Sequence, residues 1–128
     1  MKTFSTDKAP AAIGPYSQAK GISLPIHDIV FVSGQIPIDP ASGNIAGSTI
    51  EEQAEQSCKN VGEILKASGT GYEDVVKTVC FLADMDDFAA FNAVYEKYFT
   101  SKPARSYVAV KSLPKGVLCE VEAIAEVK

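Results

Sequence analysis

The chain of 128 residues has no tryptophan, a single histidine, a single arginine and only three cysteines. The cysteines, Cys58, Cys80 and Cys119, are odd in number and far apart, so a disulfide framework and a Cys-x-x-Cys zinc site do not fit. The zinc-deaminase pattern of His-x-Glu with Pro-Cys-x-x-Cys is also missing, and His27 alone does not make a His-rich metal site. We therefore expect no metal and no cofactor, and a reducing compartment such as the cytoplasm.

Positive charge and long apolar runs are scarce as well. Twelve Lys and Arg face sixteen Asp and Glu, which gives a formal net charge of −4 and a pI of about 4.9. This balance argues against nucleic-acid binding, because basic side chains must neutralise the phosphates. No apolar run approaches the roughly 18 residues of a membrane span, and the first ten residues lack the pattern of a signal peptide. We expect residues 1–128 to form one soluble cytoplasmic domain.

Hydrophobic periodicity predicts a chain of strands and helices. Strands are predicted at Ile29–Val32, Val75–Leu82, Arg105–Val110 and Val117–Val127, and helices at Thr49–Ser68 and Asp86–Phe99. Their coarse order is β-β-α-β-α-β-β, in which one of the two strands before the first helix has no assigned range, and a further strand is left open at Lys2–Ser5. This order indicates an α+β fold with a mixed sheet. The segment Pro37–Gly47 is predicted to be a loop, and a turn at Leu113–Gly116 joins the last two strands.

Local signals mark the ends and faces of these elements. Thr49 and Glu52 offer a capping box to the first helix, and Gly69 offers its stop. An aspartate is the candidate N-cap of the second helix, whose aromatic stripe is most simply core. The nearly continuous apolar run Val75–Leu82 predicts a strand that is covered on both faces.

The last strand has two faces of different character. Its odd-numbered residues, from Val117 to Val127, are apolar or small and predict the core face, since successive side chains alternate. The other face carries Leu118 and Ile124 beside glutamates. Two helices on one side of the sheet would leave that second face partly apolar and exposed, which suggests self-association.

Two charged residues are the candidates for chemistry. Arg105 is the only arginine, and its guanidinium can bind a carboxylate through two parallel hydrogen bonds, which a lysine cannot copy. From composition alone it is equally a surface residue or part of an ion pair. Glu120 lies on a regular strand and could activate a water if burial raised its pKa, or it is simply a solvated carboxylate. The sequence does not pair these two residues as a site.

The single histidine and the cysteines are weaker candidates. His27 lies in the polar connection Leu24–Asp28 with no Ser or Cys partner in view. The three cysteines fall on apolar faces, where free cysteine behaves as a small buried hydrophobe. We interpret all four as structural.

Several separate motifs stand in one order along the chain. They are Ala9–Gln18 (APAAIGPYSQ), Ser33–Pro37 (SGQIP), Phe88–Tyr95 (FAAFNAVY), Pro103–Ser106 (PARS), Leu113–Pro114 and Glu120–Ala125 (EVEAIA). With these motifs the chain resembles the RidA (YjgF-type) family of reactive-intermediate deaminases, from about Ala9 to Val127. The resemblance implies a chorismate-mutase-like α+β fold, two helices on one face of the sheet, and a homotrimer with active sites between subunits.

The resemblance also implies an activity without a cofactor. The family hydrolyses enamines and imines such as 2-aminoacrylate and 2-aminocrotonate, released by pyridoxal-phosphate-dependent dehydratases, to 2-oxo acids and ammonia. By resemblance, Arg105 would clamp the substrate carboxylate and Glu120 would position the attacking water. The family positions that line the pocket match Tyr16, Ser33, Gly34 and Asn92.

Three features depart from the family pattern. Tyr107 stands where the family commonly has a small residue, on the face of Arg105, so it is expected to line the substrate pocket and to affect substrate preference. Cys119 replaces a branched aliphatic residue before the glutamate. The connection Ala19–Asp28 is longer than usual and is a candidate specificity loop.

Other functions remain open at this stage. A regulatory module could use Arg105 to hold a 2-oxo acid without turnover, although Glu120 favours an enzyme. An endoribonuclease role fits poorly with the acidic pI, the single arginine and the lack of a histidine pair. A chaperone role would use the apolar sheet face, which a trimer would bury.

Overall fold

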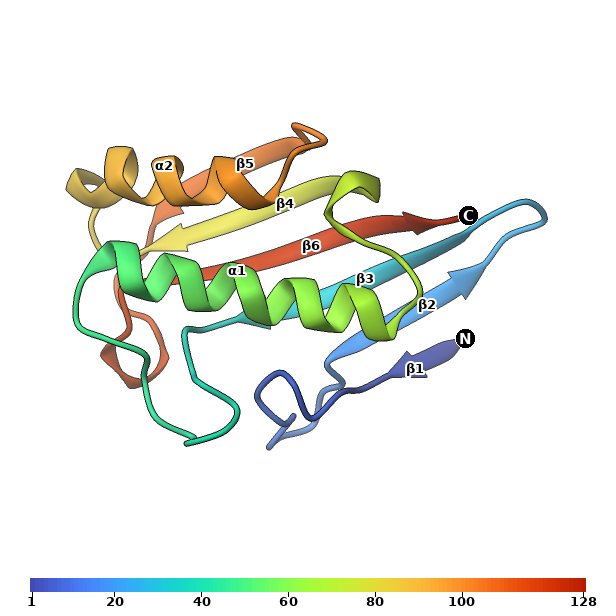
Figure 1. Cartoon of the computed structure of the whole chain (residues 1–128), viewed down its shortest axis with the longest axis horizontal. Helices are drawn as coiled ribbons and strands as arrows, with labels where there is room; N and C mark the ends of the chain where they lie inside the picture. Colours follow the sequence, from blue (N-terminus) through green and yellow to red (C-terminus); the bar gives the residue numbers. More distant parts are fainter.

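In the computed structural model, which describes residues 1–128, six strands form one mixed sheet and two α-helices cover one of its faces (Figure 1). In chain order the elements are strands β1 (Lys2–Phe4), β2 (Ala19–Ser23) and β3 (Asp28–Gln35), helix α1 (Ile50–Ala67), strand β4 (Val75–Leu82), helix α2 (Phe88–Tyr98), and strands β5 (Ala104–Ala109) and β6 (Cys119–Val127). The predicted α+β class, mixed sheet and one-sided helices are confirmed. No helix combines the length and the apolarity that a membrane span requires.

The strands lie in the order β1-β2-β3-β6-β4-β5. Only β4 and β5 run parallel, and the other neighbours are antiparallel. Helix α2 connects β4 to β5 and crosses the sheet face, as a parallel pair requires. Strand β5 is therefore an edge strand, and one side of its backbone has no partner.

Helix α1 forms where its end signals predict. The Thr49 side chain accepts a hydrogen bond from the backbone N–H of Glu52, and the Glu52 carboxylate accepts one from the backbone of Thr49, both at 3.2 Å. Gly69 follows the helix with φ of +88°, a left-handed conformation that suits glycine. The capping box and the glycine stop are confirmed.

Helix α2 begins differently from the prediction. A 3-10 turn, Met85–Asp87, precedes it, and the α-helix proper starts at Phe88. The capping side chain belongs to Asp84, which accepts a hydrogen bond from the backbone of Asp86 at 2.9 Å. The chain enters α2 through this tight turn. The capping residue, Asp84, therefore lies two residues before the predicted start of the helix at Asp86.

The segment Ala19–Asp28, described above as a candidate loop, is mostly strand. Residues Ala19–Ser23 form β2 and pair with β3 as a hairpin, which the Leu24 N–H closes by donating to the carbonyl of His27 at 2.9 Å. The additional strand left open at the N-terminus is present as β1. The sequence signal for β2 was weak because Lys20 and Gly21 interrupt its short apolar pattern.

The last two strands are joined by the turn at Leu113–Gly116, but they are not neighbours in the sheet. Strand β5 pairs with β4, whereas β6 lies in the middle between β3 and β4. A turn reverses the direction of the chain, but it does not determine which strands become neighbours in the sheet. Side-chain burial determines that. The odd-numbered residues of β6 are nearly all buried, so this strand takes a central place.

The core lies between the helices and one face of the sheet. The three cysteines are buried there, as are the aromatic residues Phe91, Tyr95 and Phe99 of the predicted stripe. These predictions are confirmed.

The opposite face of the sheet is uncovered in the chain. Strand β4 is therefore buried on one side only, contrary to the prediction: Val76 is 52% exposed, and Val79 and Phe81 are half-buried. Phe31 of β3 pairs with Ile124 of β6 and is also exposed on this face. The apolar, uncovered face that the pattern of β6 predicted is thus present.

Candidate functional site

Arg105 lies at the start of β5, under helix α2. It pairs with Thr78 of β4, whose hydroxyl is hydrogen-bonded to the Tyr95 hydroxyl at 2.7 Å. Its Nη1 donates to the Oδ1 of Asn92 at 2.7 Å. Phe88, Asn92 and Tyr95 are spaced by four and three residues, so they share one face of α2 and meet Arg105 together.

Three aromatic rings surround the guanidinium. The Cζ of Arg105 lies 4.7 Å from the ring centroid of Tyr95, 4.9 Å from that of Tyr107 and 5.5 Å from that of Phe88. Aromatic ring faces attract a cation and restrict the orientation of the guanidinium plane, and one Nη of the guanidinium is hydrogen-bonded to Asn92. The remaining N–H groups stay available for a carboxylate. We call Phe88, Asn92, Tyr95, Arg105 and Tyr107 the arginine half-site.

A cavity of about 550 Å³ opens beside this half-site. It is lined in part by Asn92, Tyr95, Arg105 and Tyr107. Its size and its single clamped guanidinium suit a small carboxylate. The predicted grouping of Arg105, Asn92 and Tyr107 is therefore present in the structure, and Phe88 and Tyr95 join them. Sequence reasoning assigned those two rings to the core, although their helical spacing with Asn92 was visible.

Glu120 lies on β6 against the backbone of β3. A Cβ built on Gly34 would lie within 1.9 Å of the Glu120 Oε2, so only glycine leaves room for this carboxylate. The pairing of β3 with β6 is irregular between Val32 and Gln35, a bulge that displaces Ser33 and Gly34. Burial, and secondarily the charge of Glu122, raise the pKa of Glu120. Its carboxylate accepts no side-chain hydrogen bond within the chain.

Tyr16 and Ser33 lie beside Gly34, the residue that the Glu120 carboxylate contacts. The Ser33 hydroxyl donates to the carbonyl of Ser17 at 2.6 Å, which fixes the N-terminal segment beside β3. Tyr16, 51% exposed, lines a cavity of about 340 Å³ together with Gly34. We call Tyr16, Ser33, Gly34 and Glu120 the glutamate half-site.

The two half-sites lie on opposite faces of the sheet. Paired residues of neighbouring strands point to the same face, and successive residues alternate. Arg105 pairs with Thr78 of β4, which is buried under the helices. Glu120 pairs with Phe81, three residues further along β4 and therefore on the uncovered face. One chain alone does not bring Arg105 and Glu120 together.

His27 is remote from both half-sites. It closes the β2–β3 hairpin, and its Nε2 lies 3.5 Å from a carboxylate oxygen of Glu126, near the far end of β6 from Glu120. In Figure 1 this hairpin projects beyond the sheet on the side of the C-terminus. Of the candidate specificity loop Ala19–Asp28, the hairpin end at His27 is therefore far from both half-sites, whereas Lys20 lines a cavity together with Tyr16 and Ser33.

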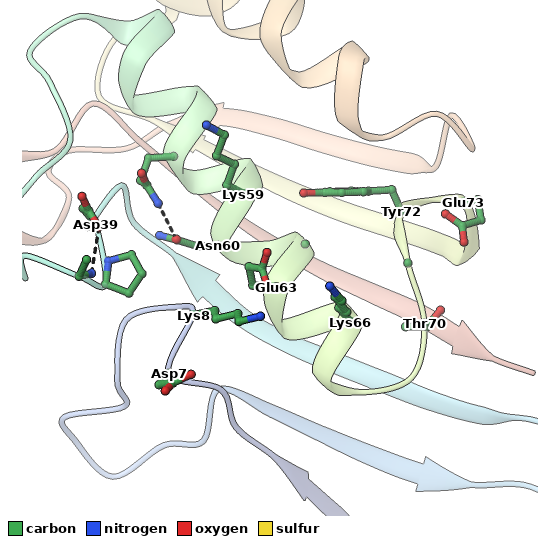
Figure 2. A pocket seen from close by; sticks show the side chains of 15 residues that line it. Asp7, Lys8, Asp39, Lys59, Asn60, Glu63, Lys66, Thr70, Tyr72 and Glu73 are labelled. Atoms are coloured by element: carbon green, nitrogen blue, oxygen red, sulfur yellow. Dashed lines mark hydrogen bonds between the residues drawn. The ribbon is translucent and has the colours of Figure 1, made fainter.

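The largest cavity of the molecule is elsewhere. It has a volume of about 780 Å³ and lies along the outer side of α1, between the N-terminal segment and the turn after the helix (Figure 2). Lysines and carboxylates alternate around it, among them Lys59, Glu63 and Lys66. None of the predicted site residues lines this cavity.

Comparison with known proteins gives a consistent fold and several functional names. A family model described as Endoribonuclease L-PSP matches residues 6–127. A Lactococcus lactis protein named as a candidate regulator, AldR, is 50% identical over 100% of this chain and 99% of its own length. A Mus musculus protein named 2-iminobutanoate/2-iminopropanoate deaminase is 49% identical over 97% of this chain and 90% of its own length. A solved structure of a candidate endoribonuclease from Thermotoga maritima superposes with a TM-score of 0.93, at 50% identity, over 100% of this chain and 98% of that one.

Proposed function

The chain belongs to the Endoribonuclease L-PSP family, which is the YjgF/RidA family, and we propose that it is a hydrolytic deaminase of reactive enamine and imine carboxylates. Its substrates would be 2-aminoacrylate and 2-aminocrotonate, or the imines they form, and its products 2-oxo acids and ammonia. The observation that carries the proposal is Arg105, held by Asn92 and three aromatic rings beside a cavity that suits a small carboxylate. Glu120, whose pKa is raised by burial, lies on the opposite face of the sheet and supplies a candidate base. The mammalian relatives named as imine deaminases support the same reaction.

The complete active site, in this proposal, forms between two copies of the chain. The half-sites lie on opposite faces of one sheet, so the glutamate half-site of one copy meets the arginine half-site of the next. Such a head-to-tail contact closes into a ring, and three copies give a homotrimer with three sites. The uncovered apolar sheet face, which carries Phe31 and Ile124, would be buried in this assembly.

The reaction needs orientation and one activated water. Arg105, held by Asn92 and the rings, binds the substrate carboxylate and fixes the imine carbon beside Glu120. Glu120 accepts a proton from water while the water oxygen bonds to the imine carbon and the nitrogen takes up a proton. The proton on nitrogen comes from solvent. The protonated Glu120 then gives its proton to the amino group of the carbinolamine, the C–N bond breaks to release ammonia, and the C=O bond forms as the hydroxyl proton passes to solvent. An enamine first takes up a proton at its β-carbon and becomes the imine.

The structure bears on the other names in the family as well. A raised pKa makes Glu120 a stronger base, which is of use in turnover and of none in simple carboxylate binding, so Glu120 favours an enzyme over a regulator. The acidic pI and the distant His27 argue against RNA cleavage. Deamination is therefore the function that the chemistry of the site supports best.

The test couples a pyridoxal-phosphate-dependent threonine or serine dehydratase to this protein and follows formation of the 2-oxo acid. Wild-type protein should accelerate product release from the imine. Arg105→Ala and Glu120→Gln should remove the acceleration. Glu126→Gln, on the same strand but beside His27, is the matched control and should behave as wild type. No acceleration by the wild-type protein with either dehydratase would contradict the proposal.

A further inference from the structure

Tyr107 is the exposed ring of the arginine half-site. Its side chain follows Arg105 by two residues on β5, so both point to the same face. It is 40% exposed, whereas Tyr95 is buried and tied to Thr78. Of the rings around the guanidinium, Tyr107 is therefore the one that a ligand bound to Arg105 would meet first.

The ring of Tyr107 is held in place. It stacks on the ring of Phe88 with a centroid distance of 4.1 Å and an interplanar angle of 16°. The Cζ of Arg105 lies 4.9 Å from the Tyr107 centroid and 5.5 Å from the Phe88 centroid, so the guanidinium lies beside this stacked pair of rings. Rotation of Tyr107 away from the cavity would break both contacts. The phenol thus forms a fixed wall of the 550 Å³ cavity and does not act as a swinging side chain.

The chemistry of the substrate brings its side chain to this wall. In a 2-imino acid the side chain begins on the carbon next to the carboxylate carbon. A carboxylate seated on Arg105 therefore places the first side-chain carbons within reach of any group that flanks the guanidinium. Tyr107 is such a group, and Phe88, stacked on one face of its ring, blocks movement of the ring in that direction.

We propose that Tyr107, braced by Phe88, is the specificity-determining residue of the deaminase function proposed above. It admits imines whose side chain has one or two carbons and rejects those with branched or aromatic side chains. Phe88 is a positioning residue in this scheme, since it acts through Tyr107. A hydrophobic wall discriminates by roughly 10-fold or more for each methylene group that does not fit.

The experiment measures kcat/KM for imines that an amino-acid oxidase generates in situ from 2-aminobutanoate, leucine and phenylalanine. Wild-type protein should prefer the small imine. Tyr107→Ala should raise the ratio of bulky to small substrate by about 10-fold or more, Phe88→Ala should raise it less, and Tyr107→Phe, which keeps the ring, should leave it unchanged. Binding of the matching 2-oxo acids gives a second readout that needs no turnover.

The outcomes separate this inference from the proposed function. A wild-type protein that hydrolyses no imine contradicts the deaminase function, and the size dependence of 2-oxo acid binding then still decides the role of Tyr107. If Tyr107→Ala and Phe88→Ala keep the wild-type ratio in both readouts, the inference is overturned while the deaminase function stands. Circular dichroism of each variant shows that it is folded.

Discussion

At the scale of single residues, Glu120 combines two properties that usually conflict. Its carboxylate is partly withdrawn from water, which raises its pKa, yet the proposed reaction needs it ionised. No side chain of its own chain donates a hydrogen bond to it, and the neighbouring charge of Glu122 opposes ionisation further. Such a residue is kept at a cost to stability, which is a common feature of functional positions.

Glu120→Gln should therefore lose activity and gain stability at neutral pH. We expect kcat to fall by roughly 10²- to 10⁴-fold, as for removal of a general base. Because the pKa is higher in the folded than in the unfolded chain, the folded chain holds this proton more tightly, and the free energy of unfolding falls as the pH rises between the two pKa values. The neutral Gln side chain does not titrate, so this decrease in the free energy of unfolding is absent from the variant. The variant should therefore be more stable than wild type at pH 7, and the difference should disappear below the ordinary glutamate pKa.

Urea unfolding of wild type and Glu120→Gln at neutral and acidic pH measures this difference. A variant that is less stable than wild type at pH 7, with the gap closing as the pH falls, would show that ionised Glu120 stabilises the fold.

The sequence singled out Arg105 and Glu120 as candidates for chemistry, but it did not predict the residues that surround them. Arg105 stood out as the only arginine, and alternation correctly placed Tyr107 on its face. The contact of Gly34 with Glu120 depends on the pairing of β3 with β6, which no local pattern encodes. Phe88 and Tyr95 were predicted as core residues because an aromatic ring at helical spacing gives the same sequence pattern whether it packs in the core or against a cation.

At the scale of elements, the bulge in β3 positions the glutamate half-site. Gly34→Ala should displace the Glu120 carboxylate, because the new methyl group would occupy its place. We expect kcat/KM to fall by roughly 10-fold or more, as small misplacements of a catalytic group cost up to about 10²-fold.

Gly21→Ala in β2 is a suitable control for this prediction, since its Cβ would meet the edge of the Phe4 ring at 2.9 Å and the Ile29 carbonyl oxygen at an ordinary 3.5 Å, and neither residue belongs to a half-site. Steady-state kinetics on both variants, with thermal unfolding as a check of folding, decides the matter. Equal activity of Gly34→Ala and wild type would remove Gly34 from the site.

The start of α1 is held by its capping box, and this can be tested apart from activity. Thr49→Ala removes the hydrogen bond to the Glu52 N–H and should lower the free energy of unfolding by about 1 kcal/mol. Thr49→Ser keeps the hydroxyl and should cost less. Urea unfolding of the three proteins measures the difference, and an unchanged midpoint for Thr49→Ala would show that the box contributes nothing.

Element boundaries followed from local signals, whereas strand neighbours did not. The capping box and the apolar stripe of α1 are properties of one segment, so the sequence predicted them well. The central place of β6 depends on burial summed over three strands, and the hairpin β2–β3 was hidden because its first strand is short and polar. Long-range pairing is the part of the fold that periodicity does not contain.

At the scale of the whole molecule, the sheet topology keeps apart the two side chains, Arg105 and Glu120, that the proposed imine hydrolysis needs in one site. Arg105 and Glu120 occupy opposite faces of one sheet, and one of these faces is apolar and uncovered. The association of identical chains that we propose would account for both facts. Oligomerisation in this account is part of the catalytic mechanism, since each active site takes one half from each of two copies.

The most direct test of this claim mixes two inactive variants. Arg105→Ala keeps the glutamate half-site, and Glu120→Ala keeps the arginine half-site. When the two are co-expressed with different tags and isolated as mixed trimers, one interface in each ring, about one third of the total, should pair two intact halves. The account predicts that each variant alone is inactive and that the mixture recovers up to about that fraction of wild-type imine hydrolysis. Verified mixed oligomers that remain as inactive as the parents would contradict it.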